Sequence, residues 1–263
     1  MGLSNLRIQL LTLLVMSIRI MVVMSLSPAF GGRAVPARLK LACAVALGAL
    51  MRPAFDSAVW VSIGMNQWLG MALNECLVGG AIGFGSAVVF YGIEMSGLCV
   101  DLFRGQTIVQ VFVPQSGDRA SQLGQMFLML AACLFFTTHA YIPFLAALHR
   151  SYLEFPVGFG FPIGLFNGTI DWTRWLKITA HSFEIALVLS APVIGVLLVT
   201  DWLLGFLNRL VPGLQVFDMG LGLKILLGIF LTALVMDRIV SGVIEEVAVG
   251  HAGELRCWID KTP

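Results

Sequence analysis

Charged residues are scarce in this sequence. Asp, Glu, Lys and Arg make up 12% of the chain, whereas hydrophobic residues make up 58%. A soluble domain usually carries about 25% charged residues, so this chain lacks the charge that a water-facing surface needs. The sequence therefore predicts an integral membrane protein. Its 263 residues could hold about six to eight apolar segments of roughly 20 residues each.

Several kinds of functional site are also missing. With a formal net charge of +1, the chain has no basic stripe that could neutralise phosphates, so we expect no nucleic-acid partner. The 5 cysteines are odd in number and form no C-x-x-C pair, which argues against a disulfide framework or a zinc site. No H-E-x-x-H, G-x-S-x-G or Walker A pattern is found. We therefore expect no catalytic residues, no metal and no cofactor.

The apolar runs are short and interrupted by Gly, Pro and single charges, and no polar linker divides the chain. We predict an all-α fold of multi-pass or intramembrane helical hairpins with broken, kinked helices, in one membrane domain, 1–263. Its expected parts are N-terminal hairpins (1–148) with a loop (101–119), a connecting loop (149–177), a C-terminal hairpin (178–236) and a cytoplasmic tail (237–263).

The segment 101–119, DLFRGQTIVQVFVPQSGDR, lies between two long apolar runs. Its charges (Asp101, Arg104, Asp118 and Arg119) are near its ends, its middle is apolar, and Pro114-Gln115-Ser116-Gly117 is a turn signal. The segment is too apolar for a purely solvated loop and too broken for a membrane span. It predicts a re-entrant or pore-facing loop, and an ordinary connecting loop is the alternative.

Nine charged residues in or beside apolar runs are candidates for buried, functional charge, because a charge in such surroundings is expensive unless it is paired or protonated. They are Arg19, Glu75, Glu94, Asp101, Arg104, Glu184, Asp201, Arg209 and Lys224. For Arg19, pairing or snorkelling is weighed against an ion pathway. For Glu75 and Glu94, pairing with Arg19, Arg104 or a partner subunit is weighed against a proton relay.

Gly79 and Gly83 form a G-x-x-x-G pattern within a run rich in small residues. Such spacing lets two helix backbones approach closely. Because no strand precedes these glycines, a nucleotide-binding fingerprint is excluded. We predict that they pack one helix against another.

Two function classes remain: a small-solute or proton-coupled secondary transporter, and a subunit of a membrane assembly. Discontinuous helices occur in both. Transporters often show internal repeats, and comparison of 8–98 with 123–236 gives no convincing one. The many glycines and short runs favour a chain that packs against other subunits.

Three groups of segments share the pattern of one family. The first runs from Arg19-Ile20 through Ser27-Pro28-Ala29-Phe30 to Val35-Pro36-Ala37-Arg38-Leu39-Lys40. The second is Glu75–Phe84 with Met95–Gly105. The third is Ala191-Pro192, Asp201–Pro212, Gln215-Val216-Phe217, Gly220 and Leu223-Lys224. They cover most of 19–236 and resemble the FliR/SctT (YscT/SpaR/HrcT-like) family, the T-type subunits of flagellar and virulence type III export apparatus. Two places depart from the pattern, at Gly213-Leu214-Gln215 and Pro114-Gln115.

The resemblance implies an all-helical subunit, present once per complex, that assembles with R-type and S-type subunits into a helical export gate and contacts the U-type switch protein. Secreted polypeptides pass through the gate in transit. The expected location is the bacterial inner membrane, within the secretion-system basal body and in contact with membrane lipid. The loop and the charged tail favour the virulence branch over the flagellar one.

In the family, a loop of this subunit plugs the closed channel, and 101–119 occupies the matching place. An apolar patch there could close a pore by contact and dewetting. The implied plug residues are Gln106, Val109, Val111, Phe112, Val113, Pro114, Gln115 and Ser116. The region Arg209-x-x-Pro212 would belong to a C-terminal hairpin that resembles an S-type subunit. Charges that are costly in lipid become reasonable where they line a wet channel or pair across subunits.

Overall fold

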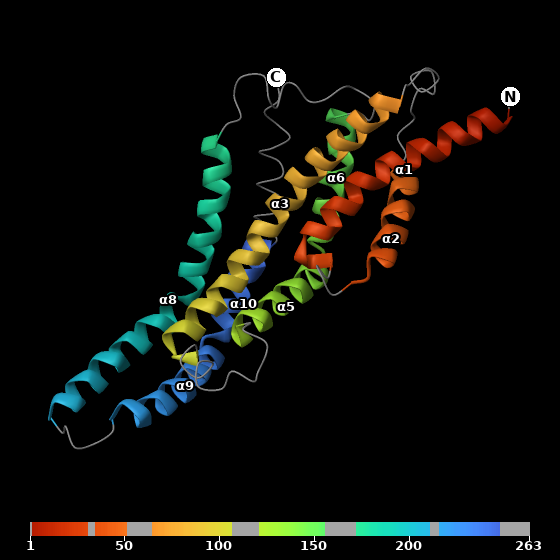
Figure 1. The fold of residues 1–263 in the computed structure, drawn as a ribbon. Helices are drawn as coiled ribbons and strands as arrows, with labels where there is room; N and C mark the ends of the chain where they lie inside the picture. The colour runs from red at the N-terminus through yellow and green to blue at the C-terminus, as the bar shows by residue number, and fades with distance from the viewer. Residues whose placement is uncertain are drawn as a thin grey trace. The chain divides into compact units, whose positions relative to one another are not determined.

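The structure, a computed structural model, describes residues 2–30, 35–51, 65–106, 121–155, 172–210 and 216–247. In this part of the chain every regular element is a helix and no strand occurs, so the predicted all-α fold is confirmed (Figure 1). The elements are α1 (Gly2–Leu26), the 3₁₀ turn η1 (Pro28–Phe30), α2 (Ala37–Leu50), α3 (Met65–Phe103), α5 (Gln122–Thr137), α6 (Tyr141–Glu154), α8 (Trp172–Leu210), α9 (Val216–Leu234) and α10 (Met236–Glu245).

Two helices are long and apolar enough to cross a membrane by themselves. The qualifying stretches are Trp68–Phe103 of α3 and Trp175–Leu210 of α8, each of 36 residues. At 1.5 Å per residue such a stretch is about 54 Å long, well beyond the roughly 30 Å of a hydrocarbon core. The described residues therefore contain fewer spans than the about six to eight segments that the chain length allows. The reason is that two very long helices contain much of the apolar sequence.

A third span is formed if α5 and α6 are taken together. The two helices are bent by 79° at a short break, where His139 adopts a positive φ of 58°. Histidine is one of the few residues with a side chain that enters the left-handed region with some frequency. A multi-pass helical membrane protein with a broken span is the arrangement predicted from the interrupted apolar runs.

The helices are longer than the sequence pattern indicated. Asp101 to Phe103, expected to begin the loop 101–119, lie in the last turn of α3. The helix ends at Phe103, and Gly105, two residues further on, has a φ of +85°, a left-handed conformation typical of the residues that follow a helix C-terminus. The helix continues to Phe103 because the Asp101 side chain is buried and has partners on α5. Residues 107–119 lie outside the described part of the chain.

Helices also occupy parts of the two segments expected to be a connecting loop and a tail. α6 continues to Glu154 and α8 begins at Trp172, inside 149–177. α10 occupies the start of 237–263, where Ile239 and Val243 are buried four residues apart. That spacing gives a helix one apolar face, which packing stabilises even though the segment is rich in charge.

The contacts divide the chain into two compact units. The first contains α1, α2, the part of α3 up to Val88, and α6. In Figure 1, α1 and α2 (red and orange) are neighbours. Phe30 of η1 lies among three rings of this unit. Its ring centroid is 6.1 Å from that of Phe135, 6.3 Å from that of Phe136 and 5.6 Å from that of Phe144.

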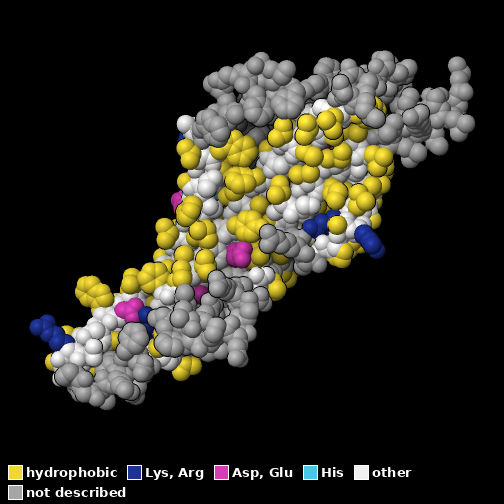
Figure 2. All heavy atoms as spheres, viewed as in Figure 1, with side chains coloured by type: hydrophobic (Ala, Val, Ile, Leu, Met, Phe, Trp, Pro, Cys, Tyr) yellow, Lys and Arg dark blue, Asp and Glu magenta, His cyan; other side chains and the backbone are white. Residues whose placement is uncertain are grey.

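The second unit contains the rest of α3, most of α5 and α8, and the helices α9 and α10. Its apolar core is built around Val100, Leu123, Val193 and Leu197, with Leu227 and Leu231 packed against it. Outside that core, large apolar side chains remain exposed on α8 and α9, including Trp202, which is 82% exposed. On the face drawn in Figure 2, hydrophobic side chains predominate over the described surface and charged ones are few. Such a surface is suited to lipid or to other subunits rather than to water.

Candidate functional site

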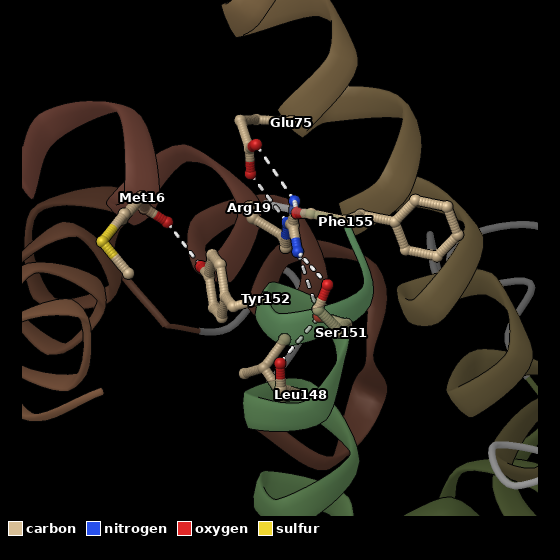
Figure 3. Close-up of polar contacts among 7 residues, drawn as sticks. All are labelled: Met16, Arg19, Glu75, Leu148, Ser151, Tyr152 and Phe155. Atoms are coloured by element: carbon tan, nitrogen blue, oxygen red, sulfur yellow. Dashed lines mark hydrogen bonds and ion pairs between the residues drawn. The ribbon is translucent and has the colours of Figure 1, made fainter. Parts of the chain in front are cut away.

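Arg19 and Glu75 form a buried ion pair within the first unit (Figure 3). The Arg19 side chain is 0% exposed and that of Glu75 is 1% exposed. Arg19 Nε donates to Glu75 Oε2 at 2.7 Å, and Nη2 donates to Oε1 at 3.0 Å. This two-bond geometry matches the planar guanidinium to the carboxylate. The sequence left three partners open for Glu75, and in the structure Glu75 pairs with Arg19.

The remaining donors of Arg19 go to the end of α6. Nη1 donates to Ser151 O at 2.9 Å and to Ser151 Oγ at 3.2 Å, and Nη2 donates to Phe155 O at 2.9 Å. The Tyr152 ring centroid lies 4.3 Å from the guanidinium carbon, and the Tyr152 hydroxyl donates to Met16 O at 2.7 Å. All five N–H groups of the guanidinium therefore have an acceptor, and the cluster joins α1, α3 and α6.

The sequence did not indicate Ser151, Tyr152 or Phe155 as partners of Arg19. Two of the acceptors are carbonyls of the last turn of α6, which is the negative end of the helix dipole and attracts cations. Such carbonyls carry no side-chain signature. Only a prediction of where α6 ends could have found them.

Gly79 and Gly83 lie where α3 crosses α1. A Cβ placed on Gly79 would be 2.8 Å from Arg19 O, and one on Gly83 would be 3.2 Å from Val23 Cα. Gly79 faces Arg19, and Gly83, four residues later, faces Val23, also four residues later. The two helices therefore run in the same chain direction where they cross. The predicted role of these glycines in close helix packing agrees with this geometry.

A second buried charge cluster lies in the second unit, at the end of α3 and the start of α5. The Asp101 carboxylate accepts a hydrogen bond from Ser121 Oγ at 2.6 Å and one from Leu123 N at 3.1 Å. Ser121 Oγ in turn accepts from Gly124 N at 2.9 Å. These backbone N–H groups belong to the first turn of α5, where the helix itself offers N–H groups no hydrogen-bond acceptor. Asp101 therefore caps α5 from another helix.

Arg104 completes this cluster. Its Nη2 lies 2.8 Å from Asp101 Oδ1, and both side chains are 5% exposed. Nη2 also donates to Gln106 Oε1, and the Arg104 side chain packs against Gly228 of α9. Within the described part of the chain Arg104 Nε has no hydrogen-bond partner. The cluster thus holds Gln106, the one expected plug residue that the structure describes.

The backbones of α3 and α5 touch beside this cluster. A Cβ on Gly97 would be 2.5 Å from Gly124 N, so only hydrogen fits there. The sequence shows both glycines but not that they meet. The contact and the Asp101 cap together fix the start of α5 against the end of α3.

The other expected charges have different surroundings. Lys224 Nζ of α9 lies 2.6 Å from Asp201 Oδ1 of α8, and Glu94 is half-buried. Glu184 and Arg209, predicted to be buried, are exposed in this chain, and the Glu184 side chain is 71% exposed. Within the described part of the chain neither charge is buried, and their pairing with another subunit or position beside a wet channel stays a prediction. Val109, Val111, Phe112, Val113, Pro114, Gln115 and Ser116 lie outside the described residues.

The model of the family "Bacterial export proteins, family 1" matches residues 10–248. The chain belongs to this family. Nearly all described residues of this export protein, including both charge clusters, fall within the match. The resemblance to the FliR/SctT family that the motifs indicated is confirmed by named relatives.

Relatives come from both flagellar and secretion systems. "Flagellar biosynthetic protein FliR" of Escherichia coli (strain K12) is 30% identical to this export protein over 223 residues, 84% of this chain and 83% of the relative. The protein of that name from Bacillus subtilis (strain 168) is 28% identical over 216 residues, 81% of each chain. "Secretion system apparatus protein SsaT" of Salmonella typhimurium is 28% identical over 183 residues, 69% of this chain and 68% of the relative.

Proposed function

We propose that this export protein is a core subunit of a bacterial type III export apparatus and forms part of the channel through which unfolded polypeptide substrates enter. Membership of the export family and the names of its relatives support the apparatus. The two candidate spans and the bent helix pair support a position in the membrane. We assign that membrane to the bacterial inner membrane, within the basal body of the secretion system.

The observation that carries the channel role is the Asp101 cluster. It brings the end of α3 and the start of α5 together through buried hydrogen bonds, so the segment between them is tethered at both ends. The middle of that segment is apolar in sequence, with Val109, Val111, Phe112 and Val113. An apolar segment on a fixed base can block a narrow pore by contact and by excluding water. We propose that 106–116 is the plug of the closed channel.

We further propose that R-type and S-type export-gate subunits and the U-type switch protein are the neighbours of this chain. The exposed apolar side chains of α8 and α9 support this, because α8 also carries the exposed charges Glu184 and Arg209. A charge facing lipid is costly, whereas one facing another protein can be paired. The proposed role is structural, with no catalysis and no cofactor.

The proposal is tested by expressing the full chain with an affinity tag, with and without the R- and S-type subunits encoded in the same cell. We expect the chain to be purified in one complex with both, and to be degraded or aggregated without them. Deleting its gene should abolish secretion of polypeptide substrates, and the full chain should restore it. A stable monomer that moves a small solute into vesicles would contradict the proposal and favour a secondary transporter.

A further inference from the structure

Helix α10 has a narrow buried apolar face and contacts α8 at Gly242. Ile239, Val243 and Val247 are buried at intervals of four residues, and a Cβ on Gly242 would lie 3.4 Å from Leu189 of α8. The other side of α10 is exposed and polar, with Asp237, Arg238, Ser241 and Glu245. A short helix held in this way is stabilised by few contacts, so a single polar interaction can change its stability measurably.

Such an interaction is made by His181 of α8. His181 Nε2 lies 3.2 Å from Glu246 Oε2, directly after α10, and Nδ1 lies 3.4 Å from Glu184 Oε2, one turn along α8. The side chains of His181 and Glu246 are 31% and 28% exposed. The imidazole lies about two turns from the start of the apolar stretch that begins at Trp175, and so near one end of that stretch.

The two contacts depend on the charge of the imidazole. A neutral imidazole has one N–H, so it can donate to only one of the two carboxylates, whereas an imidazolium donates from both nitrogens and carries a positive charge. Hydrogen bonds between charged groups are roughly twice as strong as neutral ones. Between about pH 5 and 8, histidine is the side chain that ordinarily changes its charge.

The other charged groups near His181 are few in the described part of the chain. On α8, Lys177 precedes it by one turn and is exposed. On α10, Glu245 adjoins Glu246 and is exposed. α3 packs against Ser182 at Gly92 and carries the half-buried Glu94 two residues further on. Among the groups named here, carboxylates outnumber cations around the imidazole.

We propose that His181 and Glu246 form a pH-sensitive clasp that holds α10, and with it the start of the C-terminal segment, more tightly against α8 as the pH falls below neutral. The stabilisation is present while the imidazole is protonated and is lost as the pH rises through its titration. The signal is the proton concentration on the side of the membrane that bathes this end of α8. The clasp does not depend on the plug proposed for 106–116.

Hydrogen–deuterium exchange of the full chain, purified in complex with its co-expressed subunits, tests the clasp. Exchange of the peptide 236–247 is compared at pH 5.5 and 7.5 after correction for the intrinsic rate. We expect protection of this peptide to be about two- to fivefold greater at pH 5.5, the range for a partly exposed ion pair. His181→Gln and Glu246→Gln should each abolish the difference between the two pH values.

Two matched variants serve as controls. Glu245→Gln removes the same charge from the neighbouring, exposed position of α10, and His149→Gln removes an exposed histidine of α6. Both should keep the wild-type pH dependence. The clasp is overturned if wild type shows no difference between the two pH values, or if the difference persists in Glu246→Gln. Since Glu246 is partly exposed, that variant decides the matter even if His181→Gln does not accumulate.

Discussion

Asp101 and Ser121 are 20 positions apart in the chain, yet the carboxylate of one accepts a 2.6 Å hydrogen bond from the hydroxyl of the other. Ser121 accepts in turn from the first turn of α5, where a negative charge is favourable because the helix dipole is positive there. One buried carboxylate therefore ends one helix, begins the next and fixes the base of the segment between them. Two of the following predictions depend on this arrangement.

Asp101→Asn should destabilise the protein by about 3 kcal/mol or more, because it leaves the buried guanidinium of Arg104 without its ionic partner. Thermal unfolding of the purified complex measures the effect. Asp237→Asn, which changes an exposed carboxylate of α10, should have little effect. Equal stability of the two variants would show that the Asp101 cluster contributes nothing to the fold.

Shortening 106–116 while retaining Asp101 and Ser121 should leave the complex assembled but raise its passive leak to ions. The physical reason is that the apolar side chains that exclude water from the pore are removed while the base remains. Conductance of proteoliposomes containing the complex is the measurement. Phe112→Ala, at unchanged length, should raise the leak less. An assembled, shortened variant with wild-type leak would contradict the plug.

Arg19→Lys should be strongly destabilising, by about 3–5 kcal/mol, although it conserves the charge. Lysine has three donors on one atom and cannot reach the Glu75 carboxylate and the α6 carbonyls together. Chemical unfolding in detergent gives the value, and Arg38→Lys, on the exposed side of α2, is the matched control.

Arg19→Met and Glu75→Leu should each be strongly destabilising when made alone. The double variant should be more stable than either of them, since replacing both members of a buried pair avoids an unpaired charge. If the double variant is less stable than either single variant, the ion pair itself is not what the single variants disturb.

Gly97→Ala should prevent α3 and α5 from touching, because the added carbon would lie 2.5 Å from Gly124 N. We expect a loss of about 1–3 kcal/mol, typical of overpacking, and a decrease in assembled complex. Gly85→Ala, on the same helix with nothing within 4 Å, should be neutral or stabilising by up to about 1 kcal/mol, as alanine favours a helix. Both are compared by thermal unfolding.

The sequence predicted best those features for which it allowed few alternatives. Arg19 was among the few cations that could neutralise Glu75 inside apolar sequence, so the cost of charge placed it among the three possible partners, and the structure decided between them. Gly79 and Gly83 were found because their spacing alone places them on one helix face. The helical fold followed from long apolar runs without strand patterns.

What the sequence could not give depends on which surfaces meet. Gly97 meets Gly124, and Arg19 meets the carbonyl of Phe155, without any local pattern that links them. Glu184 and Arg209 were candidates for buried charge because they lie in apolar sequence, but burial of a side chain requires another element, of this chain or of a partner subunit, on that side of α8. The end of α3 was placed too early because the partner that stabilises its last turn, Ser121, lies beyond the loop.

The Arg19 cluster also constrains the order in which the protein is made. Arg19 is synthesised long before Ser151, which lies 132 positions later. At about 5–20 residues per second, a ribosome needs roughly 7–26 s to cover that distance. During this time the guanidinium lacks the α6 acceptors that it has in the finished fold, so placing α1 in lipid carries the cost of an incompletely paired charge. We expect it to wait at the translocation machinery, and nascent chains that stop before Ser151 to be targets for membrane proteases.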